Sequence, residues 1–249
     1  MDIQLSGKKA IVTGAAHGIG RGIVQTLAAH GAEVWGWDIL PDELELVKEH
    51  ENGERIHTAT VDGTDSIAID RTVAEMGGAD IFVHSAGGVC GQVGQPLENV
   101  TQQQFQQIFD VNIKGAFLIS QAVVPTMKTK GWGRIVTISS GAGFGISLTG
   151  IQAYASAKAG QMGLVRQLAH ELGGFGITVN SVAPGFIRSN PASEKQWHAM
   201  GEEKQKQLID GAPIKRPGEP QDIANGVLFF VSDLASWVSG QTLKVSGGR

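Results

Sequence analysis

Short apolar runs alternate with longer segments of helical periodicity along the whole chain. The predicted strands are residues 9–13, 33–37, 55–61, 81–84, 134–139, 178–182 and 242–245. Helical segments are predicted between them at 19–30, 44–51, 67–76, 105–130, 154–172 and 222–232. This alternation is typical of an α/β protein, here a Rossmann-type doubly wound seven-stranded parallel sheet with helices on both faces.

The pattern of hydrophobic and polar positions also predicts how the chain is divided into domains. The run Ile81-Phe82-Val83-His84 is almost wholly apolar, which suits a strand that is buried on both faces of a parallel sheet. No Pro/Ser-rich linker interrupts the alternation, so we expect one domain over residues 1–249. The stretch 189–215 is polar and helix-prone, and we expect a substrate lid at about 188–216.

Composition narrows the class of partner. The 249 residues are 41% hydrophobic and 18% charged, with a net charge of −4, which is ordinary for a globular protein. The absence of a run of like charges argues against nucleic acid or an anionic membrane as the main partner. We see no apolar run of about 18 residues and no signal peptide, so we expect no membrane association. Cys90 is the only cysteine, which fits a reducing cytoplasm.

A glycine-rich loop follows the first strand and opens the first helix. Its residues are Thr13-Gly14-Ala15-Ala16-His17-Gly18-Ile19-Gly20. Glycines at such a turn let the backbone approach a pyrophosphate, and the helix N-terminus offers free N–H groups to phosphate. We therefore expect a dinucleotide to bind at Gly14, His17, Gly18, Ile19 and Gly20.

Asp38 ends the second strand, and its position bears on the choice of dinucleotide. A carboxylate at this point accepts hydrogen bonds from the adenosine ribose hydroxyls and repels a 2′-phosphate. Ile39, Leu40 and Pro41 follow, so no cation stands beside it in the sequence. The sequence therefore favours NAD(H) over NADP(H), although a turn or helix-capping aspartate is the alternative.

Tyr154 and Lys158 form the first candidate for catalysis. Tyr154 is the only tyrosine, and Lys158 is four residues later, on the same face of the predicted helix. A lysine ammonium near a phenol favours the phenolate and lowers its pKa from about 10. Such a phenol can give and take protons near neutral pH. Taken alone, the pair is also compatible with two unrelated side chains on a helix surface.

These residues together resemble the short-chain dehydrogenase/reductase family, and the resemblance covers essentially the whole chain. The resemblance also rests on Asn112, Ser140 and Pro184-Gly185, and on residues 240–242 and 247–248. The resemblance implies an oxidoreductase that transfers a hydride between nicotinamide and a secondary alcohol or ketone. It also implies a homotetramer, with the helices that begin near Phe105 and Tyr154 packing across one interface.

The resemblance assigns roles to the catalytic residues. Tyr154 is implied to be the general acid in carbonyl reduction and the general base in alcohol oxidation. Lys158 is implied to lower the Tyr154 pKa and to bind the nicotinamide ribose. Ser140, rather than Ser139, would hold the substrate oxygen. Asn112 would organise water beside Lys158, although a helix-interior hydrogen-bonding role is the alternative.

The resemblance also extends the set of cofactor contacts. Asp62 with Gly63 matches the position at the adenine, and Ala86 with Gly87 matches the stretch beside the adenosine ribose. The segment after the sixth strand would face the nicotinamide. The full expected set is Gly14, His17, Gly18, Ile19, Gly20, Asp38, Asp62, Gly63, Ala86, Gly87, Asn112, Tyr154, Lys158, Pro184, Gly185, Ile187 and Ser189.

Two places depart from the family pattern. The chain reads His84-Ser85-Ala86-Gly87 where the family usually has Asn-Asn-Ala-Gly. The first Asn commonly ties its strand to the neighbours, so we expect His84 either to replace that link or to be buried in the neutral form. The family also often has Thr where Arg188-Ser189 stands, and Ser189 can supply the hydroxyl.

Three segments are expected to line the substrate pocket, and none identifies the substrate. They are residues 88–93, residues 143–147 leading to Gln152, and the insertion with Arg188, Trp197, His198 and Met200. Arg188 is either an anion site or half of a surface ion pair, and Trp197 either closes a lid or packs its helix. Acyl-carrier, sugar, steroid and cyclic ketone substrates all remain open.

Other functions were weighed against this one. A 3-oxoacyl-carrier-protein (or CoA) reductase-like enzyme is the main alternative, and a non-catalytic dinucleotide-sensing protein is the second. Epimerase or dehydratase relatives are usually longer. The seven histidines show no paired metal spacing, so no metal site is predicted.

Overall fold

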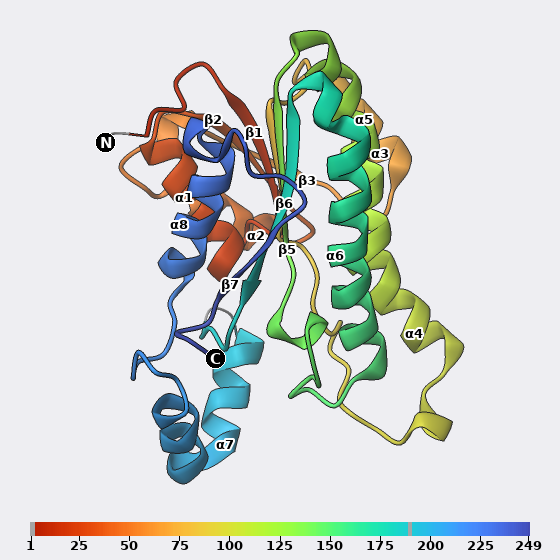
Figure 1. The fold of residues 1–249 in the computed structure, drawn as a ribbon, viewed down its shortest axis with the longest axis vertical. Coiled ribbons are helices and arrows are strands. Elements are labelled where there is room, and N and C mark those ends of the chain that lie inside the picture. The colour runs from red at the N-terminus through yellow and green to blue at the C-terminus, as the bar shows by residue number, and fades with distance from the viewer. Residues whose placement is uncertain (1–2, 189–190) are drawn as a thin grey trace.

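The computed structural model describes residues 3–188 and 191–249. One parallel sheet has the strand order β3-β2-β1-β4-β5-β6-β7 (Figure 1). Its strands are β1 (Lys9–Thr13), β2 (Glu33–Asp38), β3 (Ile56–Thr60), β4 (Ile81–His84), β5 (Gly133–Ile138), β6 (Ile177–Pro184) and β7 (Thr242–Val245). The strand order reverses between β1 and β4, and the crevice at such a point is where open α/β sheets bind ligands.

Helices cover both faces of the sheet, and the predicted fold class is confirmed (Figure 1). They are α1 (Gly18–Ala29), α2 (Pro41–Glu45), α3 (Ser66–Glu75), α4 (Gln102–Phe109), α5 (Gly115–Lys130), α6 (Gln152–Leu172), α7 (Pro191–Asp210) and α8 (Pro220–Val231). One buried core joins α1 and α8 to the sheet, and a second joins α3, α5 and α6 to the opposite face. Every residue of β4, β5 and β6 is buried between these layers, as expected for a parallel sheet.

Several predicted boundaries were wrong. The helix expected at 44–51 is instead α2 followed by a 3₁₀ turn at Leu46–Lys48, because Pro41 begins the helix early. The helices expected to begin at 105 and 154 begin at Gln102 and Gln152. For α4 the reason is a capping box: Thr101 Oγ1 accepts from the Gln104 N–H at 3.2 Å, and Gln104 Oε1 accepts from the Thr101 N–H at 2.9 Å.

A π-helical turn at Asp110–Lys114 joins α4 to α5. Such turns are rare and often occur at functional sites. The continuous stretch Gln102–Lys130 is long and apolar enough to span a membrane by length and composition, which corrects the expectation that no segment would be. Core helices pass the same test, and here Ile119, Val123 and Met127 are buried against the sheet.

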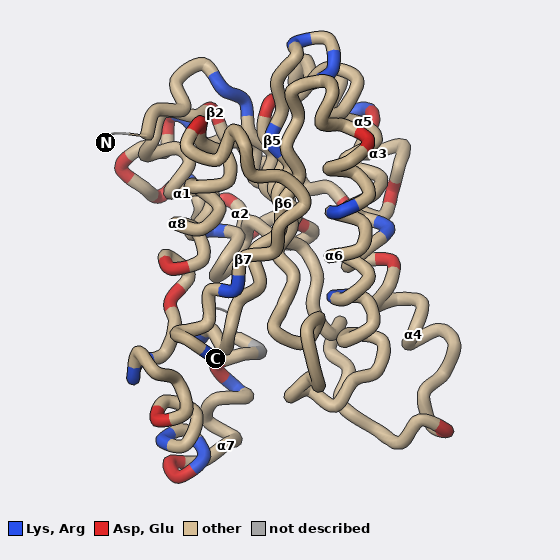
Figure 2. Tube along the Cα trace, viewed as in Figure 1, with Lys and Arg blue, Asp and Glu red and all other residues tan. Residues whose placement is uncertain are grey.

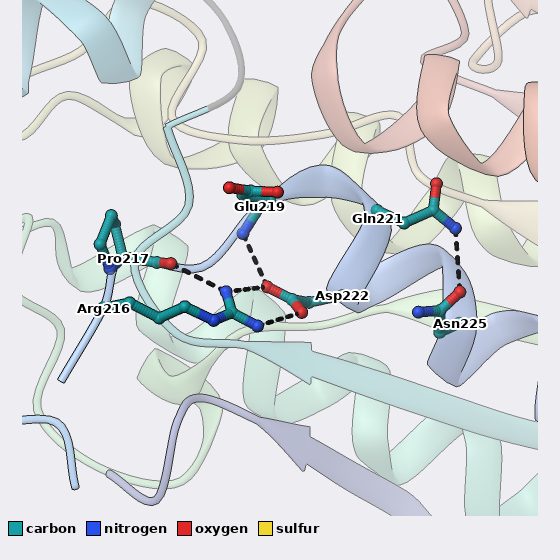
Figure 3. Close-up of polar contacts among 6 residues, drawn as sticks. All are labelled: Arg216, Pro217, Glu219, Gln221, Asp222 and Asn225. Atoms are coloured by element: carbon teal, nitrogen blue, oxygen red, sulfur yellow. Dashed lines mark hydrogen bonds and ion pairs between the residues drawn. The ribbon is translucent and has the colours of Figure 1, made fainter. Parts of the chain in front are cut away.

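The segment between α7 and α8 is fixed by a charged cap (Figure 3). The Arg216 guanidinium donates to both Asp222 oxygens, at 2.7 and 2.6 Å, and to the Pro217 carbonyl at 3.0 Å. Asp222 also accepts from the Glu219 N–H at 2.9 Å, and the Arg216 contact lowers the Asp222 pKa. This cap sets where the chain leaves the α7 region and enters α8, which packs against α1.

Candidate active site

A cavity of about 1890 Å³ lies at the carboxyl ends of the strands. Its walls come from the glycine-rich loop, the ends of β2 and β3, the loop after β4, the segment after β5 and the segment after β6. All of the predicted catalytic and cofactor residues lie on or next to it, except Ser189, which is outside the described residues.

The glycine-rich loop forms a cradle that side chains would fill. Gly14 has φ +68°, and a Cβ there would lie 2.8 Å from the Ala86 nitrogen. A Cβ on Gly20 would lie 1.9 Å from the Gly14 oxygen. His17 lines the same cavity, and its buried Nδ1 has no hydrogen-bond partner among the described residues. The cradle fits a dinucleotide pyrophosphate at the N-terminus of α1.

Two carboxylates line the cavity at the ends of β2 and β3. Asp38 Oδ2 accepts from the Ala16 N–H at 3.0 Å, and its Oδ1 accepts from the Ile39 N–H at 2.7 Å. Asp62 Oδ1 accepts from the Thr64 N–H and hydroxyl, both at 2.8 Å. The Asp38 bonds hold its carboxylate against the glycine-rich loop, where a ribose would lie.

His84 replaces the family asparagine and is buried in the neutral form, so both expected outcomes are found. Its Nε2 donates to the Val111 carbonyl at 3.2 Å, which leaves Nδ1 to accept from the Thr13 hydroxyl at 3.2 Å. Burial, helped by the nearby Lys158 charge, lowers the His84 pKa to about 3. His84 thereby links β4 to β1 and to the π-helical turn.

The two serines after β5 have different surroundings. Ser139 is buried, and its hydroxyl donates to the Lys158 carbonyl at 2.9 Å, which ties β5 to α6. Ser140 is half-buried on the cavity wall, where its hydroxyl accepts from the Ala142 N–H at 3.2 Å and is close enough to Tyr154 to oppose the rise in the phenol pKa. The geometry therefore supports Ser140 as the serine that can hold a substrate oxygen beside the phenol.

The predicted direction of the Tyr154 pKa shift is wrong for this structure. Burial raises the Tyr154 pKa, and the Ser140 hydrogen bond opposes that shift. Lys158 is itself buried, which lowers its pKa to about 7, so only part of the population carries the charge at neutral pH. Its Nζ lies 5.8 Å from the Tyr154 ring centroid and donates to the Ile138 carbonyl at 2.8 Å. Desolvation by burial is the largest cause of the shift at both groups.

Asn112 lies in the π-helical turn, where its side chain has a structural role. Its Nδ2 donates to the Gly88 carbonyl at 2.9 Å and the Ile108 carbonyl at 2.8 Å, and its Oδ1 accepts from the Gly88 N–H at 3.0 Å. A Cβ on Gly87 would lie 2.5 Å from Asn112 Oδ1 and 3.6 Å from Lys158 Nζ. These bonds are compatible with the helix-interior alternative for the Asn112 side chain.

Gln161 was missed by the sequence reasoning. It is completely buried, its Nε2 donates to the Asn112 carbonyl at 2.9 Å, and its Oε1 accepts from Lys158 Nζ at 3.5 Å. The amide therefore joins the π-helical turn to the lysine. Its position three residues after Lys158, among apolar neighbours such as Met162 and Val165, was the signal that could have identified it.

The end of β6 and the residues after it form another part of the cavity wall. The Gly185 N–H donates to the Val245 carbonyl at 2.9 Å, and a Cβ on Gly185 would lie 3.0 Å from Ser246 Cα. Ile187 is buried and pairs with Gly218. Pro184, Gly185 and Ile187 all line the cavity, as the resemblance implied.

The predicted substrate residues of the insertion are mainly structural. Arg188 makes a two-bond ion pair with Glu194, at 3.1 and 2.8 Å, and lies 5.0 Å over the buried Trp197 ring. From α7, Ser193 and Gln196 line the cavity instead. Gln152 also serves the fold, because its amide donates to the Gln95 carbonyl at 3.0 Å.

Two further points concern ligands other than the dinucleotide. Cys90 lines the cavity, and burial raises the pKa of its thiol, so it is a poor nucleophile at neutral pH. Among the described residues, no group of three His, Cys, Asp or Glu side chains could hold a metal ion.

Comparison with known proteins adds independent findings. A family model described as Enoyl-(Acyl carrier protein) reductase matches residues 14–249. The 3-oxoacyl-[acyl-carrier-protein] reductase of Escherichia coli is 36% identical over 249 residues, covering 99% of this chain and 98% of the relative. The 7α-hydroxysteroid dehydrogenase of Escherichia coli is 37% identical over 254 residues, covering 99% and 96%.

Solved structures agree with these matches. A 7α-hydroxysteroid dehydrogenase complexed with NADH and 7-oxo glycochenodeoxycholic acid has a TM-score of 0.89 and 36% identity, covering 99% of this chain and 96% of that one. A gluconate 5-dehydrogenase from Beutenbergia cavernae with bound NADP has a TM-score of 0.88 and 30% identity, covering 99% and 98%.

Proposed function

This chain belongs to the short-chain dehydrogenase/reductase family, and on that premise we propose that it interconverts a ketone and a secondary alcohol with NAD(H). It is an oxidoreductase of the family's alcohol/ketone dehydrogenase kind. The observation that carries the proposal is the convergence of Ser140, Tyr154 and Lys158 on one cavity, which the segment Pro184–Ile187 also lines.

Each catalytic side chain then has a distinct task. The Ser140 hydroxyl donates a hydrogen bond to the substrate carbonyl oxygen and fixes it beside the phenol. Tyr154 gives its proton to that oxygen during reduction and takes it back during oxidation. The raised Tyr154 pKa keeps the phenol protonated and ready to act as the acid. When bound, the nicotinamide supplies or accepts the hydride.

The choice between the two nicotinamide cofactors rests on Asp38. Its carboxylate is held at the end of β2 by backbone N–H groups, where it would accept from a ribose and repel a 2′-phosphate. Arg21 is the cation nearest in sequence to the cradle, and its guanidinium is engaged by the carbonyls of Ala16 and Glu43. Both features support NAD(H) over NADP(H).

Tyr154→Phe tests the proposed chemistry with little change of shape. We expect reduction of a panel of ketones by NADH to fall by about 10²–10⁴-fold, the usual contribution of a general acid. NADH fluorescence should show that the cofactor still binds. Ser140→Ala should lose more activity than Ser139→Ala, because the Ser140 hydroxyl acts on the phenol whereas the Ser139 hydroxyl donates to the Lys158 carbonyl. Turnover of the phenylalanine variant within tenfold of wild type would refute the role of Tyr154.

A 3-oxoacyl-carrier-protein (or CoA) reductase is the second candidate, favoured by the name of the 36% identical relative. A panel that sets 3-oxoacyl thioesters beside simple ketones separates the two. We also propose that the chain acts as one domain with a lid at about 188–216, and that it works in the cytoplasm as a homotetramer.

A further inference from the structure

The charged side chains that line the cavity are separated by sign. Asp38 and Asp62 lie at the ends of β2 and β3, where the adenosine would bind. Asp110, in the π-helical turn, also lines the cavity, and its carboxylate accepts from the Gln106 amide at 2.8 Å. The exposed cations of the lining, Lys244 and Arg249, come from β7 and the residues after it (Figure 2).

Lys244 is next to the catalytic segments. It pairs in the sheet with Ala183, one residue before Pro184. Its Nζ lies 4.3 Å from the centroid of Phe144, in the loop that follows Ser140. Over residues 3–188 and 191–249, neither Lys244 nor Arg249 makes an ion pair, whereas Arg188 is paired with Glu194. The free ammonium thus lies between the nicotinamide segment and the substrate loop.

The loop that contacts the Lys244 ammonium also carries a rim of apolar side chains. Phe144, Ile146 and Leu148 line the cavity, and their exposed fractions are 48%, 98% and 76%. Large apolar side chains gathered on one loop commonly mark a binding surface. Phe144 belongs to both features, because Lys244 Nζ lies over its ring and its side chain is one of the three that form the rim.

We propose that the substrate is an apolar ketone or alcohol that also carries a carboxylate, and that Lys244 binds this carboxylate. The proposal rests on the proposed function, since it assigns the substrate class of the same site. The carbonyl is held by Ser140 and Tyr154, the body lies on the apolar rim, and the carboxylate pairs with the ammonium above Phe144.

Matched acids and esters test the proposal. The probes are levulinate and longer-chain keto acids, each beside its own methyl ester, with NADH as the reductant. Wild type should show kcat/KM about two- to fivefold higher for the acid, as expected for an exposed ion pair. The difference should lie in KM, because the pair binds the ground state and the transition state alike. It should shrink as ionic strength rises.

Variants identify the group responsible. Lys244→Gln should abolish the preference for the acid, and Lys244→Glu should reverse it. Lys128→Gln is the matched control, because Lys128 lies 4.4 Å over the Phe175 ring but outside the cavity. The control should keep the wild-type ratio of kcat/KM for the acid to kcat/KM for its ester. An acid preference that survives in Lys244→Glu would overturn the proposal, as would equal kcat/KM for acids and esters in wild type.

The experiment separates this proposal from the one on which it rests. If esters are reduced with the same kcat/KM as acids, the dehydrogenase function is supported and the carboxylate site is refuted. If no ketone is reduced, the proposed function falls, and calorimetric binding of the same acid and ester to the NADH-loaded protein still decides the charge preference. Selective reduction of phosphate-bearing thioesters with no response to Lys244→Gln would also overturn the carboxylate site.

Discussion

Replacing His84 by Asn should remove much of the acid sensitivity of folding. The His84 pKa is about 3 in the folded chain, against 6.5 for an ordinary histidine. Between these values the unfolded chain binds the proton and the folded chain does not, so stability falls as the pH falls. The contribution of His84 to folding stability is fully present above pH 6.5 and is lost progressively as the pH falls toward 3.

The size of the effect follows from the same two values. From about pH 7 to about pH 5, the linkage relation gives a loss of about 2 kcal/mol from His84 alone. This figure is insensitive to the folded pKa as long as it stays below about 4. Asn cannot titrate, but its amide can still donate to the Val111 carbonyl, so His84→Asn should keep the link between β4 and the π-helical turn.

Urea unfolding at both pH values measures the prediction. Wild type and variant should be compared at one protein concentration, so that titrations common to both cancel. His198→Asn is the control, because that side chain is 74% exposed, and it should lose as much stability as wild type. If His84→Asn also loses about 2 kcal/mol over this range, His84 is not the buried neutral group inferred here.

Three further predictions concern the cofactor, the lysine and the assembly. Asp38→Ala should weaken NADH binding more than NADPH binding in fluorescence titrations, and a wild-type preference for NADPH would refute the cofactor proposal. Gln161→Leu should destabilise the fold by about 1–3 kcal/mol by depriving the buried Asn112 carbonyl of its donor from α6. It should also move the pH profile of alcohol oxidation upward, because a Lys158 ammonium that loses an acceptor is less often charged and stabilises the Tyr154 phenolate less. An unchanged profile would show that the amide is only structural. Light scattering should give a homotetramer, and a monomer would contradict the family expectation.

The fold and the positions of the site could be predicted from the sequence because both depend on local patterns. Strands such as Ile81–His84 are almost wholly apolar, and this alone indicates burial on both faces. The glycine-rich loop and Asp38 stand at strand ends, and in a parallel sheet those ends meet at one edge. The order of these signals along the chain was enough to predict the family.

The tertiary structure alone decided the electrostatics and the roles of individual side chains. The sequence predicted a lowered Tyr154 pKa from the spacing of Tyr154 and Lys158, but burial raises it and lowers that of Lys158, because desolvation depends on everything that surrounds a group. Gln161 could be recognised only when its contacts to Asn112 and Lys158 were known. Lys244 and Phe144 are a hundred residues apart in sequence, and only the folding of β7 beside β6 brings them to one cavity. Local sequence therefore determined which chemistry this chain carries. Long-range packing decided the charge of each group and which side chains surround it.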